Sequence, residues 1–140
     1  MDESERSRSH VTLRRPRVVV VDDDEVLADV VERWLVAIFD VEVFSESRRA
    51  LEFLSSSSVD LVVSDLTMPG LDGGELFDRV TSASPEMATR FVFMSGGSAS
   101  SLAALAARTG CEVLSKPFSR ETLHAAVGRA LRRARQVAPG

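Results

Sequence analysis

The sequence predicts an α/β fold built on one doubly wound, five-stranded parallel sheet. Short runs rich in β-branched and aromatic residues alternate with helical patterns along the chain. Several of these runs are apolar on consecutive residues, which is typical of strands that helices cover on both faces. The chain has 140 residues, 44% of them hydrophobic and 27% charged, the usual size and composition of a single globular domain. One domain of this class is therefore expected.

Five runs are predicted to be strands because they are short, apolar and bounded by turn residues. They are Val18 to Val21, Val41 to Phe44, Leu61 to Ser64, Phe91 to Met94 and Glu112 to Leu114. A helical pattern follows each run, so the connections are expected to be right-handed crossovers. In such a sheet a ligand site lies beyond the carboxyl ends of the strands.

The first predicted helix has Asp24 as its N-cap and an apolar face that recurs at helical spacing. The residues of that face are Leu27, Val30, Val31, Trp34, Leu35 and Ile38. A second helix is expected from about Ser47 to Leu54, followed by a linker from Ser55 to Ser58.

Three further helices complete the alternation. The third begins after Gly73-Gly74 and directs Leu76, Phe77 and Val80 inward. The fourth covers Ser98 to Arg108. The fifth opens at Ser119 and ends in the basic segment 131–135. Its buried face is predicted to consist of Leu123, Ala126, Val127 and Leu131.

Both ends of the chain are polar. Residues 1–16 are rich in Ser, Arg and Glu and are expected to form a mobile lead-in, with the domain at 17–134 and a tail at 135–140. The net charge is −4, so direct nucleic-acid binding is not expected. The basic side chains near the end are interpreted as a solvated face; they are Arg129, Arg132, Arg133 and Arg135.

A cytoplasmic location is expected. The apolar runs, Val18 to Val21 among them, are too short to span a bilayer, and residues 1–9 lack the apolar core of a signal peptide. The single cysteine, Cys111, cannot form an internal disulfide and is interpreted as a small core residue in a reducing compartment.

Polar side chains of complementary types follow four of the predicted strands. They are Asp22, Asp23 and Asp24 after the first strand, Asp65 after the third, Ser95 after the fourth and Lys116 after the fifth. In a doubly wound sheet these loops open on one edge, so the side chains can converge. Clustered carboxylates repel one another, and a hard divalent cation such as magnesium (Mg2+) relieves the repulsion. A carboxylate beside such an ion can act as a nucleophile toward a phosphoryl group.

Four segments at these strand ends match one set of motifs. They are Val18-Val19-Val20-Val21-Asp22-Asp23, the run Asp60-Leu61-Val62-Val63-Ser64-Asp65-Leu66-Thr67-Met68-Pro69-Gly70-Leu71-Asp72-Gly73, Phe93-Met94-Ser95-Gly96 and Lys116-Pro117-Phe118. This set resembles that of response-regulator receiver domains of two-component signalling, of the chemotaxis-regulator type, over residues 17 to about 134. The resemblance implies a flavodoxin-like receiver fold with strand order 2-1-3-4-5.

The resemblance also implies roles for individual residues. Asp65 is the expected phosphoacceptor, and Ser95 and Lys116 are expected to contact the acyl phosphate. The magnesium pocket is expected to consist of Asp22, Asp23 as a direct ligand, Asp65 and the main-chain carbonyl of Thr67. The Lys116-Pro117 bond is expected to be cis, a form that X-Pro bonds tolerate.

In this interpretation the chain is a signalling domain and not an enzyme. It is expected to accept phosphate from a histidine kinase or phosphotransfer protein and to change its binding to a downstream protein target. By family analogy, the fourth helix, fifth strand and fifth helix form the output face or a homodimer face. Few residues follow Arg135, so action through partners is expected, either as a stand-alone phosphorelay protein, which Met1 favours, or as part of a longer protein.

The chain departs from the family pattern at one position. Receivers usually carry Tyr or Phe three residues before the lysine, whereas this chain has Val113. The aromatic half of the switch is therefore missing, and output is expected to rely on loop and helix shifts. The pair Gly96-Gly97 would give the loop after Ser95 the backbone freedom for such a shift.

Two other functions remain open. Asp22-Asp23-Asp24-Glu25-Val26 resembles the nucleophile motif of haloacid-dehalogenase-type phosphohydrolases, with Asp22 as nucleophile. That family needs an acidic pair after the lysine, whereas this chain offers only Glu121, and the motif leaves Asp65 unexplained. The other alternative is a phosphorylation-independent scaffold, which Val113 keeps open although the site residues are present. Each motif alone has a structural explanation, such as a helix start or a turn, but four strand ends with matching residue types favour the receiver.

Overall fold

The computed structural model describes residues 14–137 and contains one five-stranded sheet, in which all neighbouring strands are parallel. The strands are β1 (Arg17–Val21), β2 (Asp40–Phe44), β3 (Leu61–Asp65), β4 (Phe91–Ser95) and β5 (Glu112–Ser115). Their order is β2-β1-β3-β4-β5. The predicted fold class and strand order are confirmed, and each predicted strand agrees with the structure to within one residue at either end.

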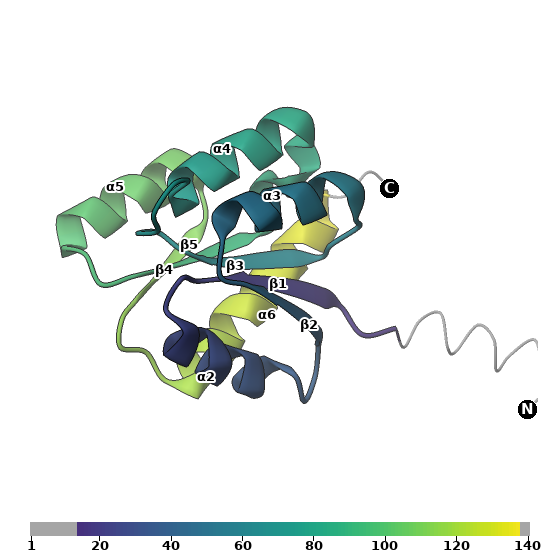
Figure 1. Cartoon of the computed structure of the whole chain (residues 1–140), viewed down its shortest axis with the longest axis horizontal. Coiled ribbons are helices and arrows are strands. Elements are labelled where there is room, and N and C mark those ends of the chain that lie inside the picture. The colour runs from purple at the N-terminus through teal and green to yellow at the C-terminus, as the bar shows by residue number, and fades with distance from the viewer. Residues whose placement is uncertain (1–13, 138–140) are drawn as a thin grey trace, which may run out of the picture.

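Helices cover both faces of the sheet (Figure 1). They are α2 (Glu25–Leu35), α3 (Ser47–Ser56), α4 (Gly73–Ala83), α5 (Ala99–Thr109) and α6 (Arg120–Val137), with a 3-10 helix η1 (Pro85–Thr89) before β4. Figure 1 shows α3, α4 and α5 on one face and α2 and α6 on the other. Within residues 14–137, none of the helices has both the length and the apolar character needed to cross a bilayer.

The interior strand β1 explains why the predicted strands are apolar on consecutive residues. Its residues Val18 to Val21 are all fully buried. Val18 and Val20 pack in the core beneath α2 and α6, whereas Val19 and Val21 pack in the core beneath α3 and α4. Because side chains alternate between the faces of a strand, two covered faces require apolar residues at every position.

Side-chain caps set the starts of α2 and α4. The carboxylate of Asp24 accepts hydrogen bonds from the backbone N–H groups of Val26 and Leu27, which confirms the predicted N-cap of α2. Asp72 and Glu75 form a reciprocal capping box at the start of α4.

The end of α2 differs from the prediction. The helix stops at Leu35, and Ile38, predicted to lie on its buried face, is 51% exposed. The backbone N–H groups of Ile38 and Phe39 both donate to the Leu35 carbonyl, so the chain turns there. The turn places Phe39 in the core, where it takes the position expected for Ile38.

The predicted linker after α3 also begins two residues too early. Ser55 and Ser56 belong to the helix, and their hydroxyls donate to the carbonyls of Leu51 and Glu52. Such bonds let serine remain in a last helical turn.

At the two ends, residues 1–13 and 138–140 lie outside the described residues, so the predicted lead-in and tail are described only in part. Arg14 and Arg15 contact the domain: Arg14 Nη2 lies 3.6 Å from Asp60 Oδ2, and Arg15 Nε donates to the Ile38 carbonyl. Helix α6 continues three residues beyond the predicted boundary at 134. In the basic segment, Arg129 is paired with Glu112 at 2.6 and 2.8 Å.

Candidate functional site

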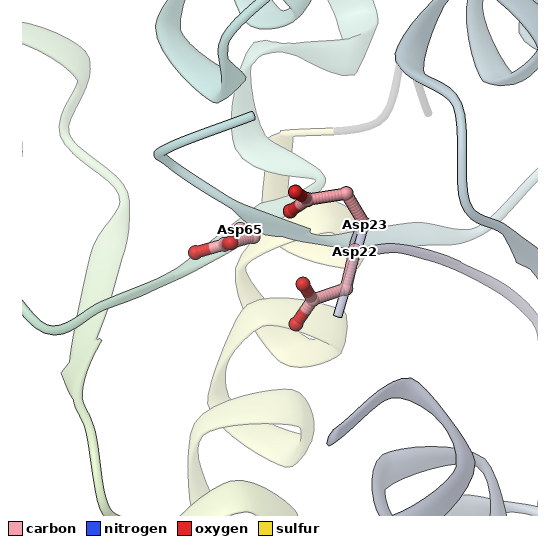
Figure 2. A group of neighbouring side chains, drawn as sticks. All are labelled: Asp22, Asp23 and Asp65. Atoms are coloured by element: carbon pink, nitrogen blue, oxygen red, sulfur yellow. The ribbon is translucent and has the colours of Figure 1, made fainter. Parts of the chain in front are cut away.

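Three carboxylates meet at the edge formed by the carboxyl ends of the strands, here called the carboxyl edge (Figure 2). Asp65 ends β3 and Asp22 follows the neighbouring strand β1, whose last residue is in register with Ser64. One carboxylate oxygen from each of Asp22, Asp23 and Asp65 lies within 4.8 Å of the other two. Asp22 is 0% exposed and Asp65 5% exposed, whereas Asp23 is open to solvent. The expected convergence of these side chains is therefore present in the structure.

Lys116 supplies a positive charge to this cluster from the end of β5. Its Nζ lies 3.0 Å from Asp65 Oδ1 and 3.9 Å from Asp22 Oδ2. The Lys116-Pro117 peptide bond is cis, as the resemblance implied.

The electrostatics of Asp22 show that one cation does not compensate this cluster fully. Burial raises the pKa of Asp22 to about 6, and the hydrogen bond from Asp24 N–H, at 2.9 Å, acts in the opposite direction. The nearby Asp65 carboxylate raises the pKa further, and Lys116 lowers it. The Oδ2 atom of Asp22 is buried and accepts no hydrogen bond from any described residue.

A buried carboxylate oxygen without a partner is costly, so the site fits a group that supplies positive charge. The donors are carboxylate oxygens, which are the ligands that hard divalent cations prefer. Asp22, Asp23 and Asp65 could therefore hold a divalent metal ion.

Ser95 ends β4 and is 5% exposed. Its hydroxyl accepts a hydrogen bond from Gly97 N–H at 2.9 Å, and its carbonyl accepts one from Lys116 N–H at 2.8 Å. The second bond ties the end of β4 to the lysine. Neither Gly96 nor Gly97 has a positive φ.

Two other predicted residues are placed by their neighbours in the chain. Thr67 lies in the loop after β3, two residues from Asp65, with its side chain exposed. Val113 pairs with Phe93 in the β4–β5 ladder, and its half-buried side chain packs against the core beneath α3, α4 and α5.

Sequence reasoning missed several contacts to the backbone around Asp65. The backbone N–H of Leu66 donates to Asp65 Oδ1 at 2.9 Å, and the Ser64 hydroxyl donates to the Asp65 carbonyl at 2.9 Å. Gly73 lies so close to this carbonyl that a Cβ on it would be 2.4 Å from the oxygen. The glycines at 73 and 74 marked a predicted helix start, but no local pattern indicates which distant backbone atom a glycine approaches.

The arrangement of fold and site agrees with the comparison with known families. The response regulator receiver domain family matches residues 18–128. The chain belongs to this family, whose members are signalling domains. Its family membership agrees with the role of a phosphoacceptor in two-component signalling.

Individual relatives show how far the similarity extends. The chain is 36% identical over 118 residues to the transcriptional regulatory protein YrkP of Bacillus subtilis, covering 84% of this chain and 50% of YrkP. It is 34% identical over 123 residues to the transcriptional regulatory protein FixJ of Bradyrhizobium diazoefficiens, covering 86% of this chain and 59% of FixJ. The chain thus spans about half the length of these relatives.

A solved structure gives the same result for the fold. The signal receiver domain of an HD domain-containing protein from Pseudomonas fluorescens superposes with a TM-score of 0.78 at 29% identity. The match covers 88% of this chain and 99% of that one. It therefore spans nearly all of that receiver domain.

Proposed function

We propose that Asp65 is the phosphoacceptor of this receiver, that magnesium is its metal ion, and that a histidine kinase or phosphotransfer protein is its phosphodonor. The observation that carries the proposal is the position of the Asp65 carboxylate. It lies between the Lys116 ammonium and two further carboxylates, one of which has a buried oxygen without a partner.

The proposed reaction is attack of an Asp65 carboxylate oxygen on phosphorus, with cleavage of the bond between phosphorus and the donor. The hydrogen bonds that Leu66 N–H and Lys116 Nζ donate to the carboxylate are both made to Oδ1. They hold the carboxylate in one orientation and leave Oδ2 as the attacking atom. Such preorganisation lowers the entropic cost of reaching the transition state.

The clustered negative charge of the three carboxylates favours binding of magnesium. Asp22, Asp23, Asp65 and the Thr67 carbonyl would hold magnesium. The bound ion would neutralise charge on the phosphoryl oxygens. Lys116 adds a second positive charge to the same oxygens, and Ser95, released from Gly97, donates a hydrogen bond to them.

The phosphohydrolase alternative requires Asp22 as nucleophile. Asp22 is the more deeply buried of the two carboxylates, and its Oδ1 already accepts the Asp24 N–H. Membership of the receiver family also favours Asp65. The domain is therefore proposed to assist its own phosphorylation and dephosphorylation, without turning over a separate substrate.

The output is proposed to be altered binding of a downstream protein or of a second copy of this chain as a homodimer. Direct nucleic-acid binding by this domain is not part of the proposal. A cytoplasmic location is proposed, because the free thiol of Cys111 fits a reducing compartment.

Intact-mass spectrometry with magnesium and acetyl phosphate tests the proposal. One phosphoryl adduct is expected in the unaltered protein, dependent on magnesium and lost in Asp65→Asn. An adduct that persists in Asp65→Asn but disappears in Asp22→Asn would establish the phosphohydrolase alternative. No adduct in any protein would favour the scaffold.

A further inference from the structure

The peptide group between Asp65 and Leu66 connects the core of the sheet to the phosphoacceptor carboxylate. Its N–H end points to two acceptors at once: Leu66 N lies 3.0 Å from the Met94 carbonyl and 2.9 Å from Asp65 Oδ1. Such a shared hydrogen bond is sensitive to small rotations of the donor. The orientation of this peptide plane therefore decides how strongly Oδ1 is held.

The carbonyl end of the same peptide is held by Ser64. Ser64 is fully buried, and its hydroxyl donates to the Asp65 carbonyl at 2.9 Å. Asp65 is the last residue of β3, whereas the ladder between β1 and β3 ends at Ser64. The Ser64 hydroxyl thus supplies a partner to a carbonyl beyond the end of that ladder.

Gly73, the first residue of α4, fixes the same carbonyl by close packing. A Cβ at this position would lie 2.4 Å from the Asp65 carbonyl oxygen and 3.0 Å from Leu66 Cα. Its backbone N–H donates to the Leu66 carbonyl at 3.0 Å, so the start of α4 is bonded to the segment it touches. The need here is for close approach of two backbones, which only glycine allows.

These contacts act on a rigid unit. A peptide group is planar, so its carbonyl oxygen and its N–H cannot turn independently. A restraint on the Asp65 carbonyl is therefore also a restraint on the direction in which Leu66 N–H points, and hence on the Asp65 carboxylate that this N–H holds.

We propose that Ser64 and Gly73 are positioning residues for the phosphoacceptor, which together fix the Asp65–Leu66 peptide plane and so aim the Asp65 carboxylate. The inference rests on the proposed function of Asp65. Neither residue touches the phosphoryl group; both act through the backbone of Asp65. Loss of either restraint slows phosphoryl transfer without weakening the binding of phosphodonor or metal.

The test uses Ser64→Ala and Gly73→Ala in the full chain. Ser64→Ala removes the hydroxyl in a nearly isosteric change, and Gly73→Ala displaces the peptide. Gly74→Ala is the matched control, because it makes the same change in the same helical turn. There the new Cβ would meet side-chain atoms, Arg108 Nη2 at 3.3 Å and Asp72 Oδ1 at 3.4 Å, which can move.

Three quantities are measured for each protein. The first is the phosphorylation rate as a function of acetyl phosphate concentration at saturating magnesium, which separates the maximal rate from the KM. The second is the magnesium Kd. The third is the amide proton chemical shift of Leu66 in the unphosphorylated protein, which reports its hydrogen bond to Asp65 and needs no phosphorylation.

For Ser64→Ala, we expect the maximal rate to fall about tenfold, with KM and the magnesium Kd unchanged and the Leu66 proton shifted upfield. The maximal rate should fall further in Gly73→Ala, and the rate of Gly74→Ala should match that of the unaltered protein. An unaltered rate in Ser64→Ala overturns the inference, as does a rate loss that follows a loss of magnesium affinity or of folding. If the unaltered protein forms no adduct, the proposed function fails instead. An unshifted Leu66 proton in Ser64→Ala overturns the positioning claim independently.

Discussion

The carboxylates at the two edges of the sheet differ in burial and in how fully they are paired. At the edge formed by the amino ends of the strands, here called the amino edge, the Asp60 side chain is 28% exposed and well paired. Its Oδ2 accepts the Arg17 N–H at 2.8 Å and lies 3.6 Å from Arg14, and its Oδ1 lies 4.0 Å from Arg90. At the carboxyl edge, Asp22 is fully buried beside another carboxylate and keeps an oxygen without a partner.

The difference separates a carboxylate that stabilises the fold from one that the proposed function uses. Asp60 closes the start of β3 against β1, and its partners come from the chain itself. Asp22 accepts one hydrogen bond, from Asp24 N–H, but its buried Oδ2 accepts none from the described residues and lies 3.9 Å from Lys116 Nζ. The incompletely compensated charge therefore lowers the stability of the fold until a ligand binds.

Raising the pH should destabilise the magnesium-free protein through Asp22. The pKa of Asp22 is raised from 3.8 to about 6, so between these values the folded protein retains a proton that the unfolded chain has lost. Stability from this group is therefore present below about pH 4 and is lost as the pH rises through about 6, by about 3 kcal/mol in total. Urea unfolding at several pH values measures it, with Asp22→Asn as the control. Parallel stability curves for the two proteins would refute the prediction.

Magnesium should restore that stability at neutral pH. At a hundred times its Kd, the ion is expected to raise the free energy of unfolding by about 2.7 kcal/mol, because it binds the folded carboxylates alone. Urea unfolding at pH 7 with and without magnesium measures the increase. Asp22→Asn and Asp65→Asn should each show a much smaller one. An equal gain in all three proteins would mean that the ion binds elsewhere.

Asp60→Ala should lower the free energy of unfolding, whereas Asp22→Asn, which removes a buried charge, should raise it. Asp60→Ala leaves the Arg17 N–H without its side-chain acceptor and removes the carboxylate 4.0 Å from Arg90, whose hydrogen bond to the Asp60 main-chain carbonyl remains, so the free energy of unfolding should fall by about 2 kcal/mol. Denaturant unfolding at pH 7 without magnesium compares the two variants. The contrast between the edges does not hold if both change stability in the same direction.

Arg14→Ala should change little. Its guanidinium lies 3.6 Å from Asp60, but its side chain is 67% exposed, and solvent screens such pairs. We expect a loss below about 0.5 kcal/mol and an unaltered rate of phosphorylation by acetyl phosphate. A loss as large as that of Asp60→Ala would assign most of the amino-edge stabilisation to this one arginine.

The sequence predicted the sheet and the convergence of the site because both follow from local patterns. Consecutive valines at 18–21 indicate a strand covered on both faces, and parallel strands must bring Asp22 and Asp65 to one edge. The end of α2 was less predictable. Ile38 and Phe39 both suit a core, and only the tertiary turn at Leu35 decides that Phe39 is buried.

The backbone contacts of the site could not be predicted for a different reason. The distance between Gly73 and the Asp65 carbonyl depends on how the β3–α4 loop returns to the sheet. Residue types restrict that path without determining it. The hydrogen bond from the Ser64 hydroxyl to the Asp65 carbonyl likewise depends on the rotamer of Ser64 and on where the ladder between β1 and β3 ends.

If Asp65 is the phosphoacceptor, the phosphoryl group is bound to its carboxylate, and peptide analysis can locate it. The protein is treated with acetyl phosphate and magnesium, reduced with borohydride, which converts an aspartyl phosphate to homoserine, and analysed by tandem mass spectrometry of its peptides. Homoserine at position 65 is the predicted result. Homoserine at position 22 or 23, with aspartate retained at 65, would contradict it.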